Sequence, residues 1–582
     1  MLQKRGVASP EALGLSLADL PTPEGLIGID VAVARLLAAR EGGERLVVVG
    51  DYDCDGACST AIAINGLEML GFTQPDHFVP DRFRLGYGLS PESVDLVSEA
   101  FRPALIVTVD NGVASVEGVE RARELGIDVV VTDHHLAPPV LPEATALINP
   151  NIPGATFESG NLAGAGVIFY VLLALRRVLA QQGDPHGKAP LGELLDLVAI
   201  ATVADLVRLD RVNRILVEQG LRRMRAGATR PGVRALMAVA GRDLTRVTTE
   251  DIGFAVAPRL NAAGRLDDMG TGIRCLLATS DADARALADE LNQLNESRRR
   301  IEAEMREEAE AQLVRLEQGP GLFQADGDGR VDAETETETE TETETETETE
   351  TGASFSIVLH DDNWHQGVIG ILAGRIKETH YRPVVVFTTD GDDRLKGSAR
   401  SIPGVHVRDV LQAIAATEVG IIEKFGGHAM AAGLTIRRSE LARFERAFEA
   451  RVSDVLEGRL PKRNYRVDGE LAPWLFDLKL ARTLESLLPW GQGCEAPGFA
   501  GEFEVASARV VGKSHLQLAL LPLDDTGRAP LDAIAFNCAL RPARGDRLHL
   551  VYSLGVNRFR NRESLQLRVQ AIAHEALPLE AR

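Results

Sequence analysis

Short apolar runs alternate with helix-like segments through the first half of the chain. The runs LVVV at 46–49, LIVTV at 105–109 and IDVVVT at 127–132 are mostly apolar or β-branched and are closed by polar turn residues. This pattern is typical of buried parallel strands. Between them, ASVEGVERARELG and CSTAIAINGLEML have helical patterns. Alternating strands and helices predict an α/β domain over residues 46–280, built on a parallel sheet.

The pattern changes after residue 280. Residues 281–318 are highly charged and free of glycine, which predicts a long helix that could bridge two lobes. In residues 353–460, SIVLHDDNWHQGVIGILAGRIKETH predicts a strand, a turn and a helix, as in a smaller α/β domain. Short alternating segments in residues 461–582 predict five or more antiparallel strands, which suit a small OB-like β-barrel. Residues 1–45 predict a short helical segment, with helix-like ALGLSLADL and IDVAVARLLAAR.

Acidic or Asp-His clusters stand at the ends of four apolar runs. In chain order they are Asp51, Asp53 and Asp55; Asp110; Asp133, His134 and His135; and Asp205, which lies in the helix-like stretch LGELLDLVAIATVADLV. The carboxyl ends of the strands of an open parallel sheet share one crevice. We therefore expect the four clusters to meet in space.

Carboxylates brought this close repel one another and raise one another's pKa, unless cations lie among them. Hard carboxylate oxygens with one or two imidazoles suit Mn²⁺ or Mg²⁺, whereas the Cys-rich spacing of a structural zinc site is absent. We expect two divalent ions about 3.5–4 Å apart, an arrangement that clamps the attacking and leaving oxygens of a phosphoryl transfer.

Each cluster taken alone has a simpler interpretation. A lone Asp after a strand, such as Asp110 or Asp205, is more often a helix cap or a turn former. The segment Asp51 to Gly56 could be a calcium-like loop, but it lacks the distal Glu of an EF-hand. His134 and His135 could belong to an ordinary turn. The four clusters together favour a shared metal centre.

Eight motifs carry a family resemblance. GDYDCDG, TVDNGV, TDHH and ATVADLV resemble the successive motifs of the DHH phosphoesterase superfamily. APRLNAAGR at 257–265, WHQGVIGI at 364–371, GSARS at 397–401 and GGHAMAAG at 426–433 resemble its RecJ branch, which carries a DHHA1 domain. The resemblance spans nearly the whole chain and favours an OB module at its end. It implies a single-strand-specific DNA exonuclease that digests from the 5′ end, releases 5′-mononucleotides and acts in recombination and repair.

The resemblance also implies roles for the clustered side chains. The implied catalytic residues are Asp53, Asp55, Asp110, His134, His135 and Asp205. Asp53 would hold one metal ion; Asp55, His134 and Asp205 would hold the other; and Asp110 would bridge both. His135 would face the phosphate, and Asp133 would orient His134 through its second ring nitrogen.

One position departs from the family pattern. Many relatives place a metal-binding His four residues before the first Asp of the Asp-x-Asp pair, and here that position is Val49. The first metal site is therefore one ligand short. Asp51 or a water molecule could complete it.

Further motif positions suggest groups that hold phosphates. They are Arg82, Arg265, Ser398, Arg400 and His428. Basic groups stabilise charge that develops on a phosphoryl oxygen, and backbone amides in glycine-rich turns can approach phosphate closely. We place Arg400 and His428 in such turns. The alternative for each arginine is a surface ion pair.

The formal net charge of −22 opposes binding of a polyanion at first sight. Nine of those charges are glutamates between Glu334 and Glu350, which leaves −13 for the rest of the chain. Residues 319–352, which contain this Glu-Thr tract, predict a disordered acidic linker, with binding of a basic partner as the alternative. Local basic groups and the metal ions must then attract DNA. Near the end of the chain, Arg558, Arg560 and Arg562 around Phe559 could follow phosphates or form a solvated hairpin tip.

Composition is that of an intracellular protein. The N-terminus has no apolar stretch of signal length, and nowhere do 18 apolar residues follow one another, so we expect a cytoplasmic location and no membrane. Five cysteines form no tightly spaced framework and predict reduced thiols. Cys54 and Cys58 flank the acidic loop, where packing is favoured over a thiolate ligand.

Three functions remain open from the sequence. The first is the single-strand exonuclease, with single-stranded DNA as its substrate, a single-strand-binding protein and a helicase as partners, and a monomeric state. The second is a phosphodiesterase for short oligonucleotides or cyclic dinucleotides, which would need no strand-tracking barrel. The third is an inactive binding scaffold, which would be expected to have lost acidic ligands, whereas all four clusters are present here.

Overall fold

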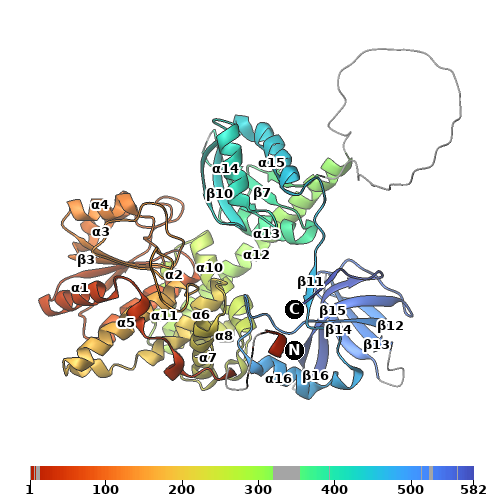
Figure 1. Ribbon diagram of the computed structural model, residues 1–582, viewed down its shortest axis with the longest axis horizontal. Coiled ribbons are helices and arrows are strands. Elements are labelled where there is room, and N and C mark those ends of the chain that lie inside the picture. Colours follow the sequence, from red (N-terminus) through yellow and green to blue (C-terminus); the bar gives the residue numbers. More distant parts are fainter. Residues whose placement is uncertain are drawn as a thin grey trace, which may run out of the picture. The chain divides into compact units, whose positions relative to one another are not determined.

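The computed structural model describes residues 2–318 and 354–582, apart from residues 6, 8, 10–12, 392, 513, 524–528, 560 and 561. These divide into two compact units (Figure 1): Met1–Glu296 with Asn464–Arg582, and Ser297–Arg463. The predicted acidic linker at 319–352 lies outside the described residues.

The first unit contains a five-stranded parallel sheet. Its order is β2 (Asp76–Phe78), β1 (Leu46–Val49), β3 (Leu105–Val109), β4 (Asp128–Thr132) and β5 (Ala146–Ile148). Every residue of β1 and β3 is buried, as expected for strands covered on both faces. The predicted parallel α/β sheet is confirmed.

Helices cover both faces of this sheet (Figure 1). On one face lie α3 (Pro91–Phe101) and α4 (Val116–Glu124); on the other lie α1 (Ile29–Gly42), α2 (Cys54–Met69) and α5 (Gly164–Gln181). Alternate strand residues divide accordingly, because Val47 and Val49 pack with α3 and α4 whereas Val48 packs with the other helices. Helix α5 is long and apolar enough to cross a membrane, but 67% of it is buried, and it forms part of this core.

A helical layer follows the sheet. It consists of α6 (Leu195–Ala204), α7 (Arg211–Arg225), α8 (Pro231–Val239), α9 (Thr249–Asp251), the π-helical turn η8 (Ile252–Val256), α10 (Ala257–Leu266) and α11 (Gly270–Leu277). Helix α6 packs against α2 and α7, so its end is held next to the start of α2. Helix α12 (Asp281–Gln318) follows with the predicted bounds.

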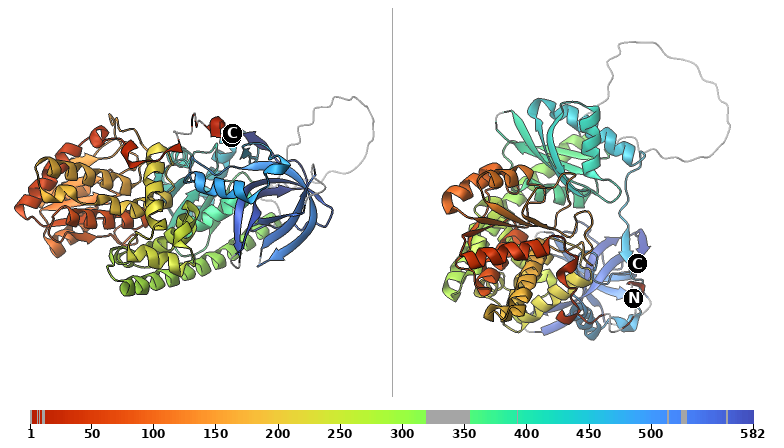
Figure 2. Two further views of the ribbon diagram at one scale, coloured as in Figure 1. Left: turned by 90° about the horizontal axis from the view of Figure 1, so that it is seen from below. Right: turned by 60° about the vertical axis from the view of Figure 1, so that its left-hand side comes forward.

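The C-terminal part of the first unit is a closed barrel (Figure 2). Its order is β12 (Phe499–Val511), β13 (His515–Pro522), β14 (Leu531–Ala535), β16 (Arg562–Ala573) and β15 (Arg547–Phe559). Four of the five strand pairs are antiparallel, but β14 pairs with β16 in parallel, so the expectation of antiparallel strands throughout was wrong for the closing pair. Helix α16 (Leu478–Leu487) packs on β15, and β11 (Tyr465–Val467) pairs with β17 (Leu579–Ala581).

The second unit is a smaller mixed sheet with helices. Its order is β6 (Ile357–His360), β7 (Val384–Thr389), β8 (Arg394–Arg400), β10 (Ala431–Arg437) and β9 (Ile422–Gly427), and its further helices are α13 (Ile369–His380), α14 (Val407–Thr417) and α15 (Leu441–Val455). Only β6 and β7 pair in parallel among the described strands of this unit. The smaller α/β domain is thus confirmed.

Two local predictions were wrong. The stretch ALGLSLADL forms no α-helix among its described residues; it contains the 3₁₀ turn η3 (Leu17–Asp19), and Ser16 and Leu20 are extended on either side. Arg400 lies at the end of strand β8 and not in a turn, because GSAR pairs with β7 and β10. The remaining 3₁₀ turns are η1 (Leu2–Arg5), η4 (Pro23–Gly25), η5 (Pro185–Lys188), η6 (Leu191–Leu194), η7 (Leu244–Arg246), η9 (Arg438–Glu440) and η10 (Pro473–Leu475).

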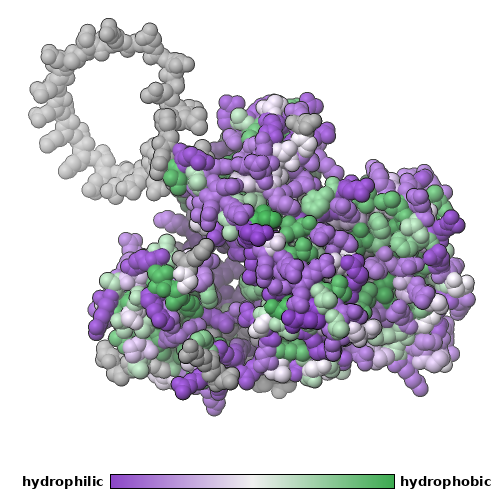
Figure 3. Space-filling model, turned by 180° about the vertical axis from the view of Figure 1, so that it is seen from behind, coloured by the Kyte–Doolittle hydropathy of each residue, from purple (hydrophilic) through white to green (hydrophobic). Residues whose placement is uncertain are grey.

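The surface is largely hydrophilic on the face drawn in Figure 3, and hydrophobic residues appear there in scattered groups. Large apolar side chains are instead concentrated in the separate cores of the sheet domain, the barrel and the second unit. Each part therefore has a core of its own.

Candidate metal centre

The first acidic cluster lies between strand β1 and helix α2. Asp53 is the N-cap of α2, and its Oδ1 accepts a hydrogen bond of 3.0 Å from the Gly56 amide. Asp51 and Asp55 are buried. The turn between the buried strand and the helix therefore carries three carboxylates, and two of them are shielded from solvent.

Asp55 is held by the start of helix α5. Its Oδ2 accepts a hydrogen bond of 2.7 Å from the Gly164 amide, and its Oδ1 accepts one of 2.9 Å from the Ala165 amide. Amides in the first turn of a helix have no partner within the helix and favour negative charge. Two elements far apart in sequence are thus joined at this carboxylate.

Asp110 lies at the end of strand β3 in a left-handed conformation, with a φ of 63°. Such a φ is uncommon for residues other than glycine, although Asp tolerates it better than most. A Cβ on Gly164 would lie 2.6 Å from the Asp110 Cβ, so only glycine allows α5 to approach this closely. Asp110 is buried between the other clusters.

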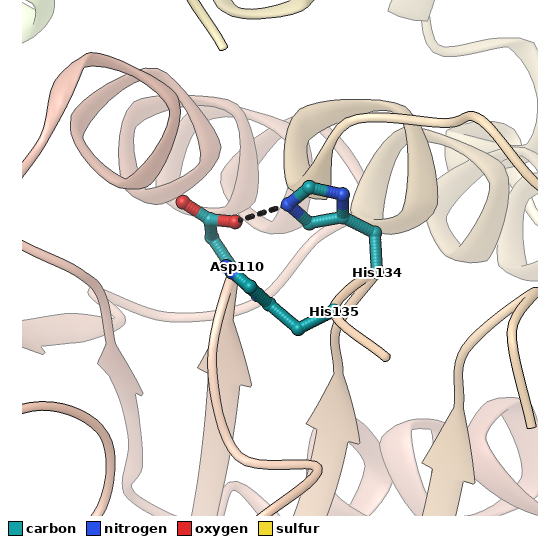
Figure 4. Close-up of side chains that lie close together, drawn as sticks. All are labelled: Asp110, His134 and His135. Atoms are coloured by element: carbon teal, nitrogen blue, oxygen red, sulfur yellow. Dashed lines mark ion pairs between the residues drawn. The ribbon is translucent and has the colours of Figure 1, made fainter. Parts of the chain in front are cut away.

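The Asp-His cluster follows strand β4. The His134 Nε2 lies 3.0 Å from Asp110 Oδ1, and the two side chains point toward one another (Figure 4). Asp133 Oδ1 lies 2.8 Å from the His135 Nδ1, so Asp133 orients His135 and not His134 as the sequence had predicted. For His134 it accepts only the backbone amide, at 2.7 Å, although the two imidazole rings lie close together, with centroids 4.5 Å apart.

Asp205 reaches the centre from a helix. It is the C-cap of α6, and its Oδ2 lies 3.6 Å from His134 Nε2. The prediction that Asp205 follows a strand was therefore wrong, whereas the helix-like interpretation of the preceding residues is confirmed. Packing of α6 on α2 explains why Asp205 still joins the other carboxylates.

These side chains form three groups of possible metal ligands, each with ligand atoms within 4.8 Å of one another. The groups are Asp51, Asp53 and Asp110; Asp55, His134 and Asp205; and Asp110, His134 and His135. Asp110 and His134 each belong to two of them. The four clusters predicted to meet do meet.

The buried carboxylates of the centre repel one another. Burial, together with the charges of Asp55 and Asp53, holds the pKa of Asp110 well above its usual value. Burial and neighbouring carboxylates raise the pKa of Asp51 and of Asp205 in the same way. Positive charge placed among them would relieve this repulsion.

The residues fit divalent cations. The Oδ1 atom of Asp110 and the Nε2 atom of His134 are both buried and, although 3.0 Å apart, have no hydrogen-bond partner of suitable geometry, whereas buried polar atoms nearly always have one. Carboxylate oxygens with imidazole nitrogen are the donor set that Mn²⁺ accepts, and carboxylates with water suit Mg²⁺. Burial lowers the pKa of His134 and so keeps its imidazole neutral, as a ligand must be.

His135 differs from His134 in charge. Burial alone would lower its pKa, but the hydrogen bond and charge of Asp133 raise the pKa of His135 to about 9. The same contact lowers the pKa of Asp133 although burial opposes this. The Tyr87 hydroxyl lies 3.0 Å from His135 Nδ1 and donates to the Asp110 carbonyl at 3.2 Å. No sequence motif pointed to Tyr87.

Arg82 lies beside the acidic loop. Its guanidinium stacks over the Tyr52 ring at 4.4 Å and donates to the Gly264 carbonyl at 3.3 Å. No carboxylate among the described residues forms an ion pair with it, so the surface ion pair considered for Arg82 is not observed. Arg82, Tyr52 and Gly264 line a cavity of about 430 Å³, and Arg265 follows Gly264 at the end of α10.

The other predicted phosphate-binding residues lie in the second unit. On β8, the Arg400 guanidinium donates to Ser398 Oγ at 3.1 Å. Burial lowers the pKa of Arg400, and no carboxylate is within ion-pair distance of it among the described residues. His428 is exposed directly after β9. The structure brings Ser398 and Arg400 together, and the phosphate roles stay a prediction.

Of the three arginines in the basic barrel segment, Arg558 is neutralised. Arg558 pairs with Glu485, and its Nε lies 3.1 Å from Glu563, which also pairs with Arg482. Arg560 lies outside the described residues. The cysteines of the acidic loop pack in the core: Cys54 and Cys58 are buried, and a hydrogen bond with Cys58 followed by burial raises the pKa of Cys54 well above its usual value.

Comparison with known families matches three domains in the same order. The matches are to the DHH family, N-terminal domain, over residues 45–202, to the DHHA1 domain over 352–454, and to the RecJ OB domain over 467–571. They cover the sheet with its acidic clusters, the second unit and the barrel.

Curated relatives resemble the chain along nearly its whole length. The single-stranded-DNA-specific exonuclease RecJ of Escherichia coli is 44% identical over 98% of this chain and 94% of its own. That of Haemophilus influenzae is 42% identical over 98% and 95%. The Thermus thermophilus protein is 32% identical over 89% of this chain and 67% of its own.

Solved structures agree in fold. The crystal structure of RecJ in complex with Mn²⁺ from Thermus thermophilus superimposes with a TM-score of 0.76 at 29% identity, over 99% of this chain and 75% of that one. A second, of exonuclease RecJ bound to manganese, gives a TM-score of 0.57 at 31% identity, over 74% of this chain and 97% of that one. With three matched domains and 44% identity to a curated member, the chain belongs to the RecJ family of single-stranded-DNA-specific exonucleases.

Proposed function

We propose that this protein hydrolyses single-stranded DNA from its 5′ end with two divalent cations, Mn²⁺ or Mg²⁺, and releases 5′-mononucleotides. The observation that carries the proposal is the position of Asp110, whose ligand atom lies within 4.8 Å of Asp51 and Asp53 in one group and of two histidines in another. A side chain shared between two ligand groups suits a pair of ions. The family assignment supports the substrate class.

The ligand groups suit two cation positions. Asp51 and Asp53 would hold one cation, Asp55, His134 and Asp205 the other, and Asp110 both. Asp51 thus takes the place that Val49 leaves without a ligand. Divalent cations bound there lower the pKa of water and stabilise charge on phosphoryl oxygens.

The remaining side chains bind and orient the DNA strand. His135 carries a positive charge at neutral pH because Asp133 supports its imidazolium, so it can hold the scissile phosphate. Arg82, with no carboxylate partner among the described residues, is available to the 5′-terminal phosphate in the adjoining cavity. We assign Arg265, Ser398, Arg400 and His428 to further phosphate contacts, by their motif positions.

A polymeric substrate is favoured over a dinucleotide. Within the first unit, a cavity of about 790 Å³ lies between the helical layer and the barrel, lined by residues that include Asn261, Phe254, Trp490 and Arg568. Asn261 is also a neighbour of the acidic loop. A DNA strand that leaves the metal centre along this cavity would reach the barrel. OB-type barrels bind single-stranded nucleic acid by base stacking and by charge.

The cellular setting follows from the same proposal. All five cysteines are free, which suits a reducing cytoplasm. A helicase would supply the single strands, a single-strand-binding protein would cover them, and a monomer contains every group named above. Recombination and repair are the processes that require such resection.

End-labelled strands test the proposal directly. DNA and RNA single strands carrying a label at the 5′ or the 3′ end are incubated with the protein and Mn²⁺, Mg²⁺ or chelator. We expect 5′-labelled DNA to yield labelled mononucleotide at once, 3′-labelled DNA to shorten gradually, and chelator to stop both. Mononucleotides released first from the 3′ end would refute the polarity, and undiminished cleavage in chelator would refute the metal mechanism.

A further inference from the structure

Helix α10 touches the acidic loop at the residue that follows Asp53. The Asn261 Oδ1 accepts a hydrogen bond of 2.8 Å from the Cys54 amide. Asn261 lies 207 positions further along the chain. The contact therefore comes from tertiary packing and not from the local turn.

The Cys54 amide needs such an acceptor. Cys54 is the first residue of α2, and the first amides of a helix have no acceptor within it. Asp53, the N-cap, satisfies the Gly56 amide with its own side chain. Asn261 supplies the acceptor that the cap leaves unfilled at Cys54.

A second contact from the same helix lies on the other side of Asp53. A Cβ on Gly264 would lie 1.8 Å from the Tyr52 carbonyl oxygen, so the α10 backbone approaches the loop too closely for any other residue. Gly264 follows Asn261 by three positions, which places both on one face of the helix. Helix α10 thus contacts the acidic loop at both neighbours of Asp53, Tyr52 and Cys54.

The loop requires this anchorage because its carboxylates repel one another. Asp51 and Asp53 have ligand atoms within 4.8 Å of each other and of Asp110, and like charges this close repel one another. Without an outside contact, repulsion would spread the loop when no cation is bound. A fixed loop presents its ligands in place, which reduces the cost of binding.

We propose that Asn261 is a positioning residue that holds Asp51 and Asp53 in register for the first cation. The inference rests on the proposed two-cation function, and Asn261 itself touches neither cation nor phosphate in it. Its partner is the Cys54 amide, and its effect reaches the cation through Asp53.

Three variants separate positioning from general stability. Asn261→Ala removes the acceptor, and Asn261→Asp keeps an acceptor oxygen at the same place. Asn65→Ala is the matched control, because Asn65 is also half-buried and donates to Ala61 within α2, away from the loop. For each full-length variant, Mn²⁺ binding to the folded protein is measured by the electron paramagnetic resonance signal of free Mn²⁺, and kcat and KM are measured on single-stranded DNA.

We expect Asn261→Ala to weaken binding of the weaker Mn²⁺ ion about tenfold, in line with other residues that orient metal ligands. Its kcat should fall at fixed Mn²⁺ while KM for DNA changes less than about twofold, since the DNA contacts proposed for Arg82, His135 and the barrel remain. Asn261→Asp should bind Mn²⁺ within about threefold of wild type, because its added negative charge does not oppose a cation. Asn65→Ala should match wild type.

Two results would overturn the inference. One is wild-type Mn²⁺ affinity in Asn261→Ala; the other is an equal loss in Asn261→Ala and Asn65→Ala, which would indicate a stability effect alone. If wild-type protein binds Mn²⁺ but leaves single strands intact, the proposed function fails while the role of Asn261 in cation binding stands.

Discussion

Asp110 combines three features that a shared metal ligand requires or tolerates. It is buried, adopts a left-handed φ, and belongs to two groups of ligands. A left-handed φ in a residue other than glycine costs about 1–2 kcal/mol, which the surrounding structure must offset. Strain of this kind at the point where four clusters meet is expected of a functional residue.

Replacement of Asp110 by alanine tests its shared role. We expect Asp110→Ala to abolish cleavage with Mn²⁺ or Mg²⁺ and to leave single-strand binding largely intact, because it deletes the shared ligand and no basic group. Nuclease assays and fluorescence anisotropy with a labelled strand measure the two effects. Asp95→Ala, which removes an exposed carboxylate paired with Arg121, is the control. Retained turnover in Asp110→Ala would rule out the bridging assignment.

The Asp133 and His135 pair makes a prediction about pH. Asp133 raises the pKa of His135 to about 9, so the stabilisation from this contact is fully present below the unfolded value near 6.5 and is lost as pH rises through about 9. In chelator, Asp133→Asn should therefore lower the His135 pKa toward 6.5 and weaken the pH dependence of thermal stability between these values. Imidazole shifts in NMR spectra report the pKa. An unchanged His135 pKa would show that Asp133 does not support its charge.

At the scale of elements, helix α5 acts as a support for two carboxylates. Its first amides hold Asp55, and the absence of a side chain at Gly164 makes room for Asp110. Helix α10 supports the acidic loop from another direction through Asn261 and Gly264. The metal centre therefore depends on how closely two helices approach the strand ends.

A methyl group at Gly164 should disturb this approach. Since the added Cβ would lie 2.6 Å from the Asp110 Cβ, we expect Gly164→Ala to destabilise the protein by about 1–3 kcal/mol and to weaken Mn²⁺ binding. Gly192→Ala is the control, because nothing lies within 4 Å of its added Cβ. Thermal unfolding and Mn²⁺ titration measure both effects. Equal behaviour of the two variants would contradict the packing argument.

At the scale of the whole molecule, the barrel is packed onto the helical layer of its own unit. The Leu209 amide donates to the Gln492 carbonyl at 2.8 Å, and Thr249 Oγ1 donates to the Trp490 carbonyl at 2.6 Å. Leu488 packs with Ile215 in a shared apolar cluster. The segment that leads into the barrel thus contributes to the stability of the first unit.

Truncation before Asn464 should separate these contributions. We expect affinity for long single strands to fall far more than the rate of dinucleotide hydrolysis, because the metal centre lies wholly in the first 296 residues of its unit. The truncated protein should also unfold at a lower temperature, since the Leu488 cluster is lost. Assays run well below that temperature, with circular dichroism to confirm folding, compare long and dinucleotide substrates. Equal losses on both would remove the argument for a strand-binding barrel.

The sequence alone determined the architecture and the members of the metal centre. Apolar runs marked the strands, and Asp51, Asp110 and His134 could be placed at their ends because strand periodicity and turn chemistry are local properties. A parallel sheet brings its strand ends together whatever its loops do. The long helix at 281–318 was predictable for the same local reason.

Only the tertiary structure decided which side chain contacts which neighbour. Asp133 contacts the His135 imidazole, Asp205 arrives from a helix end, Arg558 is neutralised by Glu485, and Asn261 caps the Cys54 amide. Each of these pairings depends on rotamers or on the close approach of elements far apart in the chain. Such distances are set by packing of the whole domain, and local sequence patterns do not encode them.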